Sequence, residues 1–220
     1  SHDGPMRFPV QYVIRPTLDF RGYAGRISSG TLHPGDEVMV LPSGRTSRVK
    51  EIVTWDGNLS EAHAPMWVTV TLEHELDISR GDILVTPSKL PHVSRRFEAQ
   101  VVWMQTEPLT TDRHFLLKHT TQQVRGQVTA VQHRTDVNTL DRIPARQLEL
   151  NEIGGVSIET VKPLFFDPYR ENRWTGSFVL IDPLTNLTAG AGMIIEREAR
   201  EERRTSALAA IDFERSRLTP

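Results

Sequence analysis

The 220-residue sequence contains no cysteine, which excludes a disulfide framework, a thiolate zinc site and a cysteine nucleophile. Long apolar runs are also absent: the longest covers about five residues, whereas a helix that spans a membrane needs roughly 20. No secretory signal pattern opens the sequence. We therefore expect a cytoplasmic protein that does not contact a membrane.

An excess of charge of either sign is lacking as well. The sequence has 26 Lys and Arg residues against 28 Asp and Glu residues, which gives a formal net charge of −2. Proteins that bind nucleic acid or anionic membranes commonly carry a basic patch or stripe. The balanced charge argues against a nucleic-acid partner and against a polybasic membrane patch.

The sequence has no phosphate-binding loop of the form G-x-x-x-x-G-K-[ST], which GTPases and ATPases use to hold nucleotide phosphates and magnesium. Residues 190–192, Gly-Ala-Gly, resemble the start of a dinucleotide-binding fingerprint, but no third glycine and no βαβ unit accompany them. Glycines that let two strands approach closely explain this motif better. We expect no cofactor site in this chain.

The ionisable residues give no convincing catalytic or metal site. His114 and His119 are five positions apart, so in a strand they face opposite sides and do not share a metal ion. Glu73, Glu75 and Asp77 alternate, and two carboxylates on one face could in principle perform acid–base catalysis. A solvated rim of charge is the commoner use of such residues. We assign no catalytic residue and no metal ligand.

What the sequence does contain is a series of short β-prone runs separated by turn residues. Within residues 23–41, Pro34 presets φ for a turn and Gly35 can adopt the positive φ that such a turn requires. Residues 67–72 alternate between two sets of side chains, as a strand with one buried face does. Strands at this spacing are typical of a small barrel or sandwich.

No segment of residues 6–195 keeps a helical apolar period over three turns, so we assign the all-β class. The expected strands cover residues 8–14, 23–27, 37–41, 48–53, 67–72, 83–85, 97–104, 115–118, 124–130, 146–150, 156–160, 178–181 and 193–195. Residues 86–92 carry two prolines and no periodicity, which is typical of a linker. The sequence predicts two consecutive small antiparallel β-barrels, at residues 6–88 and 93–195.

Both ends of the chain differ from the barrels. Residues 1–5 are interpreted as an expression remnant or a linker. Residues 196–220 begin with a dense mixture of Glu and Arg, in which Glu196 and Arg200 have helical spacing. We interpret this segment as a short charged tail, helical or frayed. A helix that docks on a partner, or that leads to a further domain, remains an alternative.

A resemblance to a known family becomes specific at residues 22–30, Gly-Tyr-Ala-Gly-Arg-Ile-Ser-Ser-Gly, followed by Pro-Gly-Asp-Glu-Val at 34–38. This segment resembles the first β-barrel after the GTPase domain in elongation-factor-Tu-like proteins. With residues 7–16 ahead of it, it is most similar to the large, GTP-binding subunit of bacterial sulfate adenylyltransferases. The similarity continues in family order at residues 97–104, 118–121, 136–140, 148–154, 166–169, 172–173, 175–182 and 188–194.

The resemblance implies a large subunit with a GTPase domain followed by two barrels, of the elongation-factor-Tu domain 2 and domain 3 type. Such a subunit works in a heterodimer with a catalytic subunit that makes adenosine 5′-phosphosulfate and pyrophosphate from ATP and sulfate, driven by GTP hydrolysis. GTP and Mg²⁺ would bind in the GTPase domain, which this sequence does not contain. We expect the chain itself to be inactive, to contact the GTPase domain of its parent and to relay the GTPase state to the catalytic subunit.

Two other functions remain open: the barrels of a translation GTPase that binds aminoacyl-RNA, and a β-barrel interaction module without a link to sulfate. As interface residues we single out Arg80, Arg170 and Arg173, which lie beside turns, because arginine is enriched at binding hot spots. The tryptophans are interpreted as core residues or interface anchors rather than platforms for bases. They are Trp55, Trp67, Trp103 and Trp174.

Overall fold

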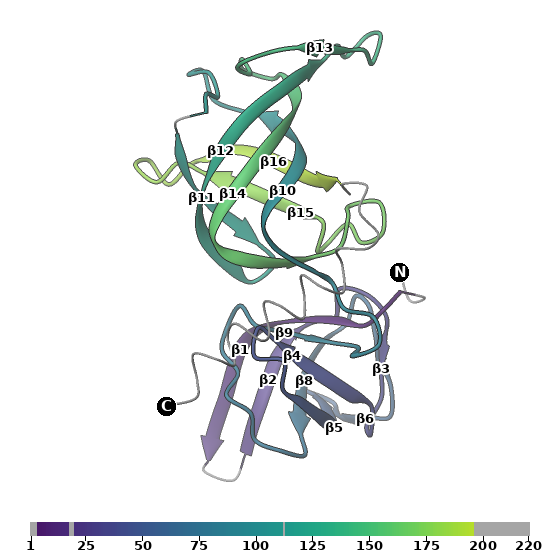
Figure 1. Cartoon of the computed structure of the whole chain (residues 1–220). Helices are drawn as coiled ribbons and strands as arrows, with labels where there is room; N and C mark the ends of the chain where they lie inside the picture. Colours follow the sequence, from purple (N-terminus) through teal and green to yellow (C-terminus); the bar gives the residue numbers. More distant parts are fainter. Residues whose placement is uncertain (1–3, 18–19, 112, 196–220) are drawn as a thin grey trace. The chain divides into compact units, whose positions relative to one another are not determined.

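The computed structural model describes residues 4–17, 20–111 and 113–195. Within these residues the chain forms two compact units, residues 4–92 and residues 93–195 (Figure 1). Every element of both units is a β-strand, and the described residues contain no helix. The all-β prediction is confirmed, while the tail expected at residues 196–220 lies outside the described residues.

The first unit is a closed barrel with short additional strands. Its strands are β1 (Arg7–Thr17), β2 (Phe20–Arg26), β3 (Thr31–Leu32), β4 (Glu37–Leu41), β5 (Thr46–Thr54), β6 (Gly57–Leu59), β7 (Ala62–His63), β8 (Trp67–Leu72) and β9 (Ile83–Val85). Neighbouring strands follow the order β4-β9-β1-β2-β8-β5, and β4 also pairs with β5, which closes the ring. Strand β6 extends the sheet from β5, whereas β3 and β7 form a separate two-stranded sheet.

Turn geometry and alternation explain this barrel. Between β3 and β4, Gly35 adopts a φ of 90°, a conformation that is open to glycine and strained for other residues. The amide of Asp36 donates to the carbonyl of His33 at 3.2 Å and closes the turn. Inward-facing side chains from every strand of the ring fill the interior, among them Phe8, Val10, Tyr23, Val38, Val40, Val49, Ile52, Val70 and Leu84.

The second unit is also a closed ring of antiparallel strands. Its strands are β10 (His92–Trp103), β11 (His114–His119), β12 (Gln122–Thr135), β13 (Arg142–Pro144), β14 (Ile153–Phe166), β15 (Ser177–Ile181) and β16 (Thr188–Ile195). The order is β11-β15-β16-β10-β14-β12, and a pairing of β11 with β12 closes the ring. Strand β13 extends the sheet from β12.

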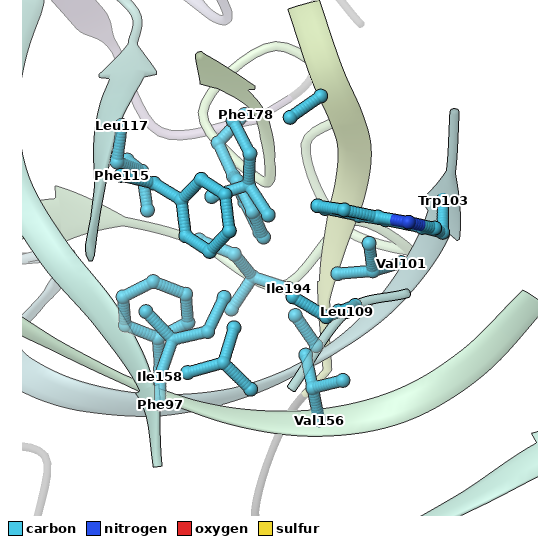
Figure 2. Packing of buried hydrophobic residues seen from close by; sticks show 14 of the residues in the cluster. Phe97, Val101, Trp103, Leu109, Phe115, Leu117, Val156, Ile158, Phe178 and Ile194 are labelled. Atoms are coloured by element: carbon cyan, nitrogen blue, oxygen red, sulfur yellow. The ribbon is translucent and has the colours of Figure 1, made fainter. Parts of the chain in front are cut away.

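The core of the second barrel is organised around aromatic side chains (Figure 2). The ring of Trp103 meets the ring of Phe115 edge-on, with centroids 5.7 Å apart. Phe97 makes a similar edge contact with Phe178 at 5.7 Å. A Cβ on Gly192 would collide with the Phe178 ring, so this glycine lets the ring lie directly on β16. The Gly-Ala-Gly motif thus serves close packing, as the sequence indicated.

One expected strand is wrong. Residues 146–150 form no strand; strand β13 ends before them, and Leu148 makes only an isolated bridge with Leu109. Leu148 is fully buried, whereas Leu150 is 45% exposed. Leu148 lies in a loop and covers the core with one apolar side chain. In the sequence, Leu148 and Leu150 alternate with polar residues as they would in a strand, and for this reason the strand prediction was wrong.

Candidate interaction surfaces

The three arginines predicted as interface residues lie in two different units. Arg80 lies in the turn before β9, and its guanidinium carbon is 5.8 Å from the ring centre of Tyr12. Tyr12 itself is 59% exposed, so the pair forms an exposed cation–π contact. Arg170 and Arg173 lie on one connection, between β14 and β15, and both are exposed. Their role in an interface remains a prediction.

The connection that carries Arg170 and Arg173, residues 167–176, has a well-defined backbone. The amide of Tyr169 donates to the carbonyl of Ile194 at 3.0 Å, and the amide of Ile194 donates to the carbonyl of Gly176 at 2.7 Å. The side-chain oxygen of Asn172 accepts from the amides of Trp174, at 3.0 Å, and Thr175, at 3.3 Å. These bonds attach the connection to β16 and fix its turns. The connection therefore holds its side chains in set positions.

A buried histidine supports the same connection from inside the barrel. His119 is 1% exposed, and its Nε2 lies 2.6 Å from the carbonyl oxygen of Thr175. Because a carbonyl oxygen only accepts, Nε2 carries the proton and donates it. The hydroxyl of Thr175 donates in turn to a carboxylate oxygen of Asp167 at 2.9 Å. Nδ1 of His119 is buried and has no hydrogen-bond partner among the described residues.

Burial lowers the pKa of His119 from 6.5 to about 4, because the charged imidazolium would lose its hydration inside the barrel. The bond to Thr175 and the charge of Asp167 favour the protonated form only in part. His119 is thus a neutral structural histidine. Sequence reasoning placed it opposite His114 and missed its support of residues 167–176. The sequence signal was its inward position, two residues after Leu117 in the alternating strand.

The four tryptophans divide into one core residue and three exposed ones. Trp103 is fully buried, whereas Trp55 is fully exposed at the turn between β5 and β6, and Trp67 is 64% exposed on β8. Trp174, at 46% exposure, lies on the connection between β14 and β15. Exposed tryptophans are enriched at protein interfaces because one side chain covers a large apolar area. The structure thus leaves three of them available as interface anchors.

The carboxylates expected at a solvated rim lie there. Glu73, Glu75 and Asp77 follow β8 and are exposed. Glu75 lies 3.9 Å from Arg15 and 3.9 Å from Arg21, and Asp77 lies 3.8 Å from Arg21. These long, exposed ion pairs contribute little to stability. Glu75 and Asp77 thus both face Arg21 and serve as ion-pair partners of arginines.

Neither a metal-binding cluster nor a membrane-spanning helix occurs in residues 4–17, 20–111 and 113–195. In these ranges no group of three His, Cys, Asp or Glu side chains is arranged to hold a metal ion. The same ranges contain no helix long and apolar enough to cross a membrane.

An exposed histidine connects two segments of the first barrel. The Nε2 atom of His33 lies 3.1 Å from a carboxylate oxygen of Glu61, and its Nδ1 atom lies 3.4 Å from Asp36. Chiefly through its hydrogen bond to Glu61, and also through Asp36, the pKa of His33 is raised above 6.5. His33 precedes β4 and Glu61 precedes β7, so the pair ties these two connections together when the imidazole is protonated.

We expect His33→Gln to destabilise the first barrel only at acidic to neutral pH. The pKa of His33 is higher in the folded than in the unfolded chain, so its stabilisation is complete below pH 6.5 and disappears as the pH rises through the folded value. Because the pair is exposed, the melting temperature at pH 5.5 should fall by only about 1–3 °C. Thermal unfolding at pH 5.5 and 8.5 measures this. Glu61→Gln should behave alike, and an effect of equal size at both pH values would contradict the assignment.

Two family models match the chain, one in each barrel. The model described as elongation factor Tu domain 2 matches residues 23–85. The model described as GTP-eEF1A C-terminal domain-like matches residues 96–195. A solved structure supports the fold independently: the crystal structure of sup35 complexed with GDP matches 90% of this chain and 48% of its own, with a TM-score of 0.80 and 19% identity.

Curated relatives are much closer in sequence. Sulfate adenylyltransferase subunit 1 of Bacteroides fragilis is 52% identical over 196 residues, which cover 89% of this chain and 41% of the relative. The protein of the same name from Chromobacterium violaceum is 53% identical over 94% of this chain and 44% of the relative. The bifunctional enzyme CysN/CysC of Rhodopirellula baltica is 51% identical over 87% of this chain and 30% of the relative.

The chain spans less than half the length of these relatives, and within that span about every second residue is identical. The two family models match in the order in which the structure places the two barrels. The chain therefore belongs to the family of sulfate adenylyltransferase subunit 1, within the elongation-factor-Tu-like proteins, as a segment that comprises two β-barrels.

Proposed function

We propose that this chain is the non-catalytic barrel portion of the cytoplasmic GTPase subunit of a sulfate adenylyltransferase. The observation that carries the proposal is the identity of about one half to proteins named sulfate adenylyltransferase subunit 1, such as the 52% over 196 residues in Bacteroides fragilis. A numbered subunit has at least one partner. The partner proposed here is the catalytic subunit, which forms adenosine 5′-phosphosulfate and pyrophosphate from ATP and sulfate.

In this role the barrels transmit the state of a GTPase domain elsewhere in the parent chain. GTP and Mg²⁺ would bind in that domain, because the 220 residues contain no phosphate-binding loop of the G-x-x-x-x-G-K-[ST] form. Closed barrels suit a relay, since a ring of paired strands moves as a body and passes a rotation from one neighbour to another. GTP hydrolysis would then favour product formation at the catalytic subunit, because the two barrels would transmit the change in the GTPase domain to that subunit.

Arg80, Arg170 and Arg173 are proposed contact residues for this function. Arg170 and Arg173 are presented by residues 167–176, whose backbone is fixed by hydrogen bonds to β16. A preorganised connection loses little conformational entropy when a partner binds. Arg80 already stacks on Tyr12, so it too is positioned before binding.

We expect this chain to form a complex with the catalytic sulfate adenylyltransferase subunit of the same source. Size-exclusion chromatography with light scattering, at micromolar concentrations of both proteins, measures the mass of any complex. Co-elution at the mass of a one-to-one complex would support the proposed role. Separate elution of two folded proteins would show that the barrels alone do not provide the contact, and would overturn the relay as proposed.

A further inference from the structure

Three neighbouring strands of the second barrel carry no carboxylate at all. Strands β15, β11 and β12 are neighbours in the ring, and their sequences contain no Asp and no Glu. This is unusual in a chain with 28 acidic and 26 basic residues. The same three strands carry exposed His114, Lys118, Arg125 and Arg134, of which Arg134 forms an ion pair with Glu152 at 3.1 Å. The outside of the barrel is therefore locally basic although the whole chain is close to neutral.

The strand register defines which side chains share this outer face. Leu116 on β11 is paired with Ile181 on β15 and with Arg125 on β12. The next outward position, Lys118, is paired with Val179 on one side and with Gln123 on the other. The intervening residues Phe115 and Leu117 point into the core (Figure 2) and are buried.

We call the set Leu116, Lys118, Arg125, Val179 and Ile181 the basic–aliphatic face. Its three aliphatic members are half-buried and its two cations are exposed. Lys118 and Arg125 are diagonal neighbours on adjacent strands, where Cα atoms are about 7–8 Å apart. Two like charges at this spacing repel each other slightly, so the arrangement is unfavourable in the free barrel.

The nearby carboxylate does not relieve this repulsion. Glu159 on β14 is paired with Gln127 of β12, but its carboxylate already lies 3.6 Å from Arg95 and 3.2 Å from Arg96. Within the described residues, neither Lys118 nor Arg125 forms an ion pair. Among the residues that the structure describes, the face thus offers two cations without an acidic partner around an aliphatic centre, and negative charge on a binding partner would complement it.

We propose that the basic–aliphatic face is the docking surface for an acidic protein segment, and, resting on the proposed function, that this segment belongs to the catalytic subunit. Carboxylates of the segment would pair with Lys118 and Arg125, and apolar side chains of the segment would cover Leu116, Val179 and Ile181. Charge complementarity of this kind raises the association rate and fixes orientation. The contact would place the partner on β11, β12 and β15.

The chemistry of the face favours a protein over a nucleic acid. Single-stranded nucleic acids bind where aromatic side chains stack on bases along a basic groove. On this face the exposed and half-buried apolar residues are aliphatic, while the aromatic rings of Phe115 and Phe178 lie in the core. Two cations also neutralise few phosphates. An acidic segment with aliphatic side chains matches the face at every position.

The test is the double charge reversal Lys118→Glu with Arg125→Glu, compared with Arg142→Glu with Arg146→Glu on the same barrel. Both variants change the net charge equally, and all four positions are exposed. Titration calorimetry with the catalytic subunit at 50 and 200 mM NaCl gives the affinity. We expect the first variant to bind at least tenfold more weakly and to lose most of the salt dependence, and the second to bind within about twofold of the original chain.

The possible results of this titration distinguish a failure of the proposed function from a failure of the proposed docking surface. No binding by the unchanged chain would overturn the proposed function and this inference with it. Binding that survives the reversal at Lys118 and Arg125, or that is weakened equally by the control pair, would overturn the inference alone. Binding of a homopolymeric RNA that the same reversal abolishes would assign the face to nucleic acid instead. The double variant Lys118→Ala with Arg125→Ala removes the two cations without adding negative charge. Its affinity should lie between those of the original chain and the double charge reversal, and the remaining difference measures the added repulsion.

Discussion

Replacing Trp103 with alanine is expected to destabilise the second barrel by about 3–5 kcal/mol, the range for deleting a large aromatic side chain from a core. Trp103 is the largest fully buried side chain of the chain's described residues. A cavity of indole size cannot be filled by its neighbours, because they belong to paired strands that hold them in place. The loss is a large fraction of the stability of a typical domain.

Specific contacts of the indole add to the lost volume. Its ring meets Phe115 edge-on at 5.7 Å, and the guanidinium carbon of Arg113 lies 5.8 Å from its centre. The indole N–H donates to the carbonyl of Glu107 at 2.8 Å. In the alanine variant this carbonyl loses its partner, and the segment before β11 loses one of its attachments to the core. The expected effect is therefore in the upper part of the range.

Urea unfolding followed by far-UV circular dichroism measures this effect without relying on tryptophan fluorescence. Because the two units can unfold separately, hydrogen exchange at amides of β11 and β16 should locate the loss in the second barrel. Trp55→Ala is the matched control: the same substitution at a fully exposed turn should change stability by less than about 0.5 kcal/mol. Equal effects of the two substitutions would contradict the packing described for Trp103.

Much of the strand pattern could be predicted because it is local. The prediction of residues 37–41, 67–72 and 83–85 as strands agrees with β4, β8 and β9 in full. Each is a short run with a turn residue close to one or both ends, such as Gly35 and Gly81, both of which have positive φ. The burial of Phe97, Ala99, Val101 and Trp103 on β10 also follows from simple alternation along the strand.

The ends of the long strands could not be predicted in the same way. Strand β12 continues to Thr135 and β14 begins at Ile153, and the two pair along residues of mixed polarity. Such positions carry no alternation, because neither face of this stretch is fully buried. Their strand structure depends on pairing between segments distant in sequence.

The candidate surfaces depend on the same non-local pairing. Leu116 and Arg125 are close in sequence, but Ile181 joins them only because β15 lies beside β11. The repulsive pair Lys118 and Arg125 likewise becomes visible only once the register is known. Charges can be counted from the sequence alone. Which cations share one face of the barrel can be determined only when the paired strands and their register are known.

Acidification from pH 7 to pH 4 is expected to lower the free energy of unfolding of the original chain by about 3 kcal/mol more than that of the His119→Gln variant. The difference is the contribution of His119. In the unfolded chain the imidazole has an ordinary pKa of 6.5, whereas burial lowers the pKa in the folded chain to about 4. Between pH 6.5 and pH 4 the imidazole of His119 is mostly protonated in the unfolded chain and mostly neutral in the folded chain. Stability is unaffected by this group above pH 6.5, and falls as the pH decreases towards 4.

Glutamine is the informative substitution because its amide can donate from the same position as Nε2 without titrating. Urea unfolding at pH 7, 6, 5 and 4 for both proteins gives the difference, and the carboxylates that titrate in this range cancel between them. His114→Gln on the same strand is the matched control, since His114 is exposed and its replacement leaves the buried bond to Thr175 in place. Parallel pH profiles of the original chain and His119→Gln would mean that His119 is solvated in the folded protein.

The same substitution tests whether the histidine positions residues 167–176. In the folded chain Nε2 donates to the carbonyl of Thr175, whose hydroxyl binds Asp167, so protonation or removal of His119 acts at the base of this connection. The protection of an amide is its intrinsic exchange rate divided by its observed rate at the same pH. For the Trp174 and Thr175 amides, which donate to Asn172, protection should therefore fall at pH 4 before the protection of β16 falls. The variant His119→Leu, whose side chain fills the space but donates no hydrogen bond, should already show fast exchange of these amides at pH 7. Slow exchange in that variant would show that packing alone holds the connection, and that the buried hydrogen bonds do not position it.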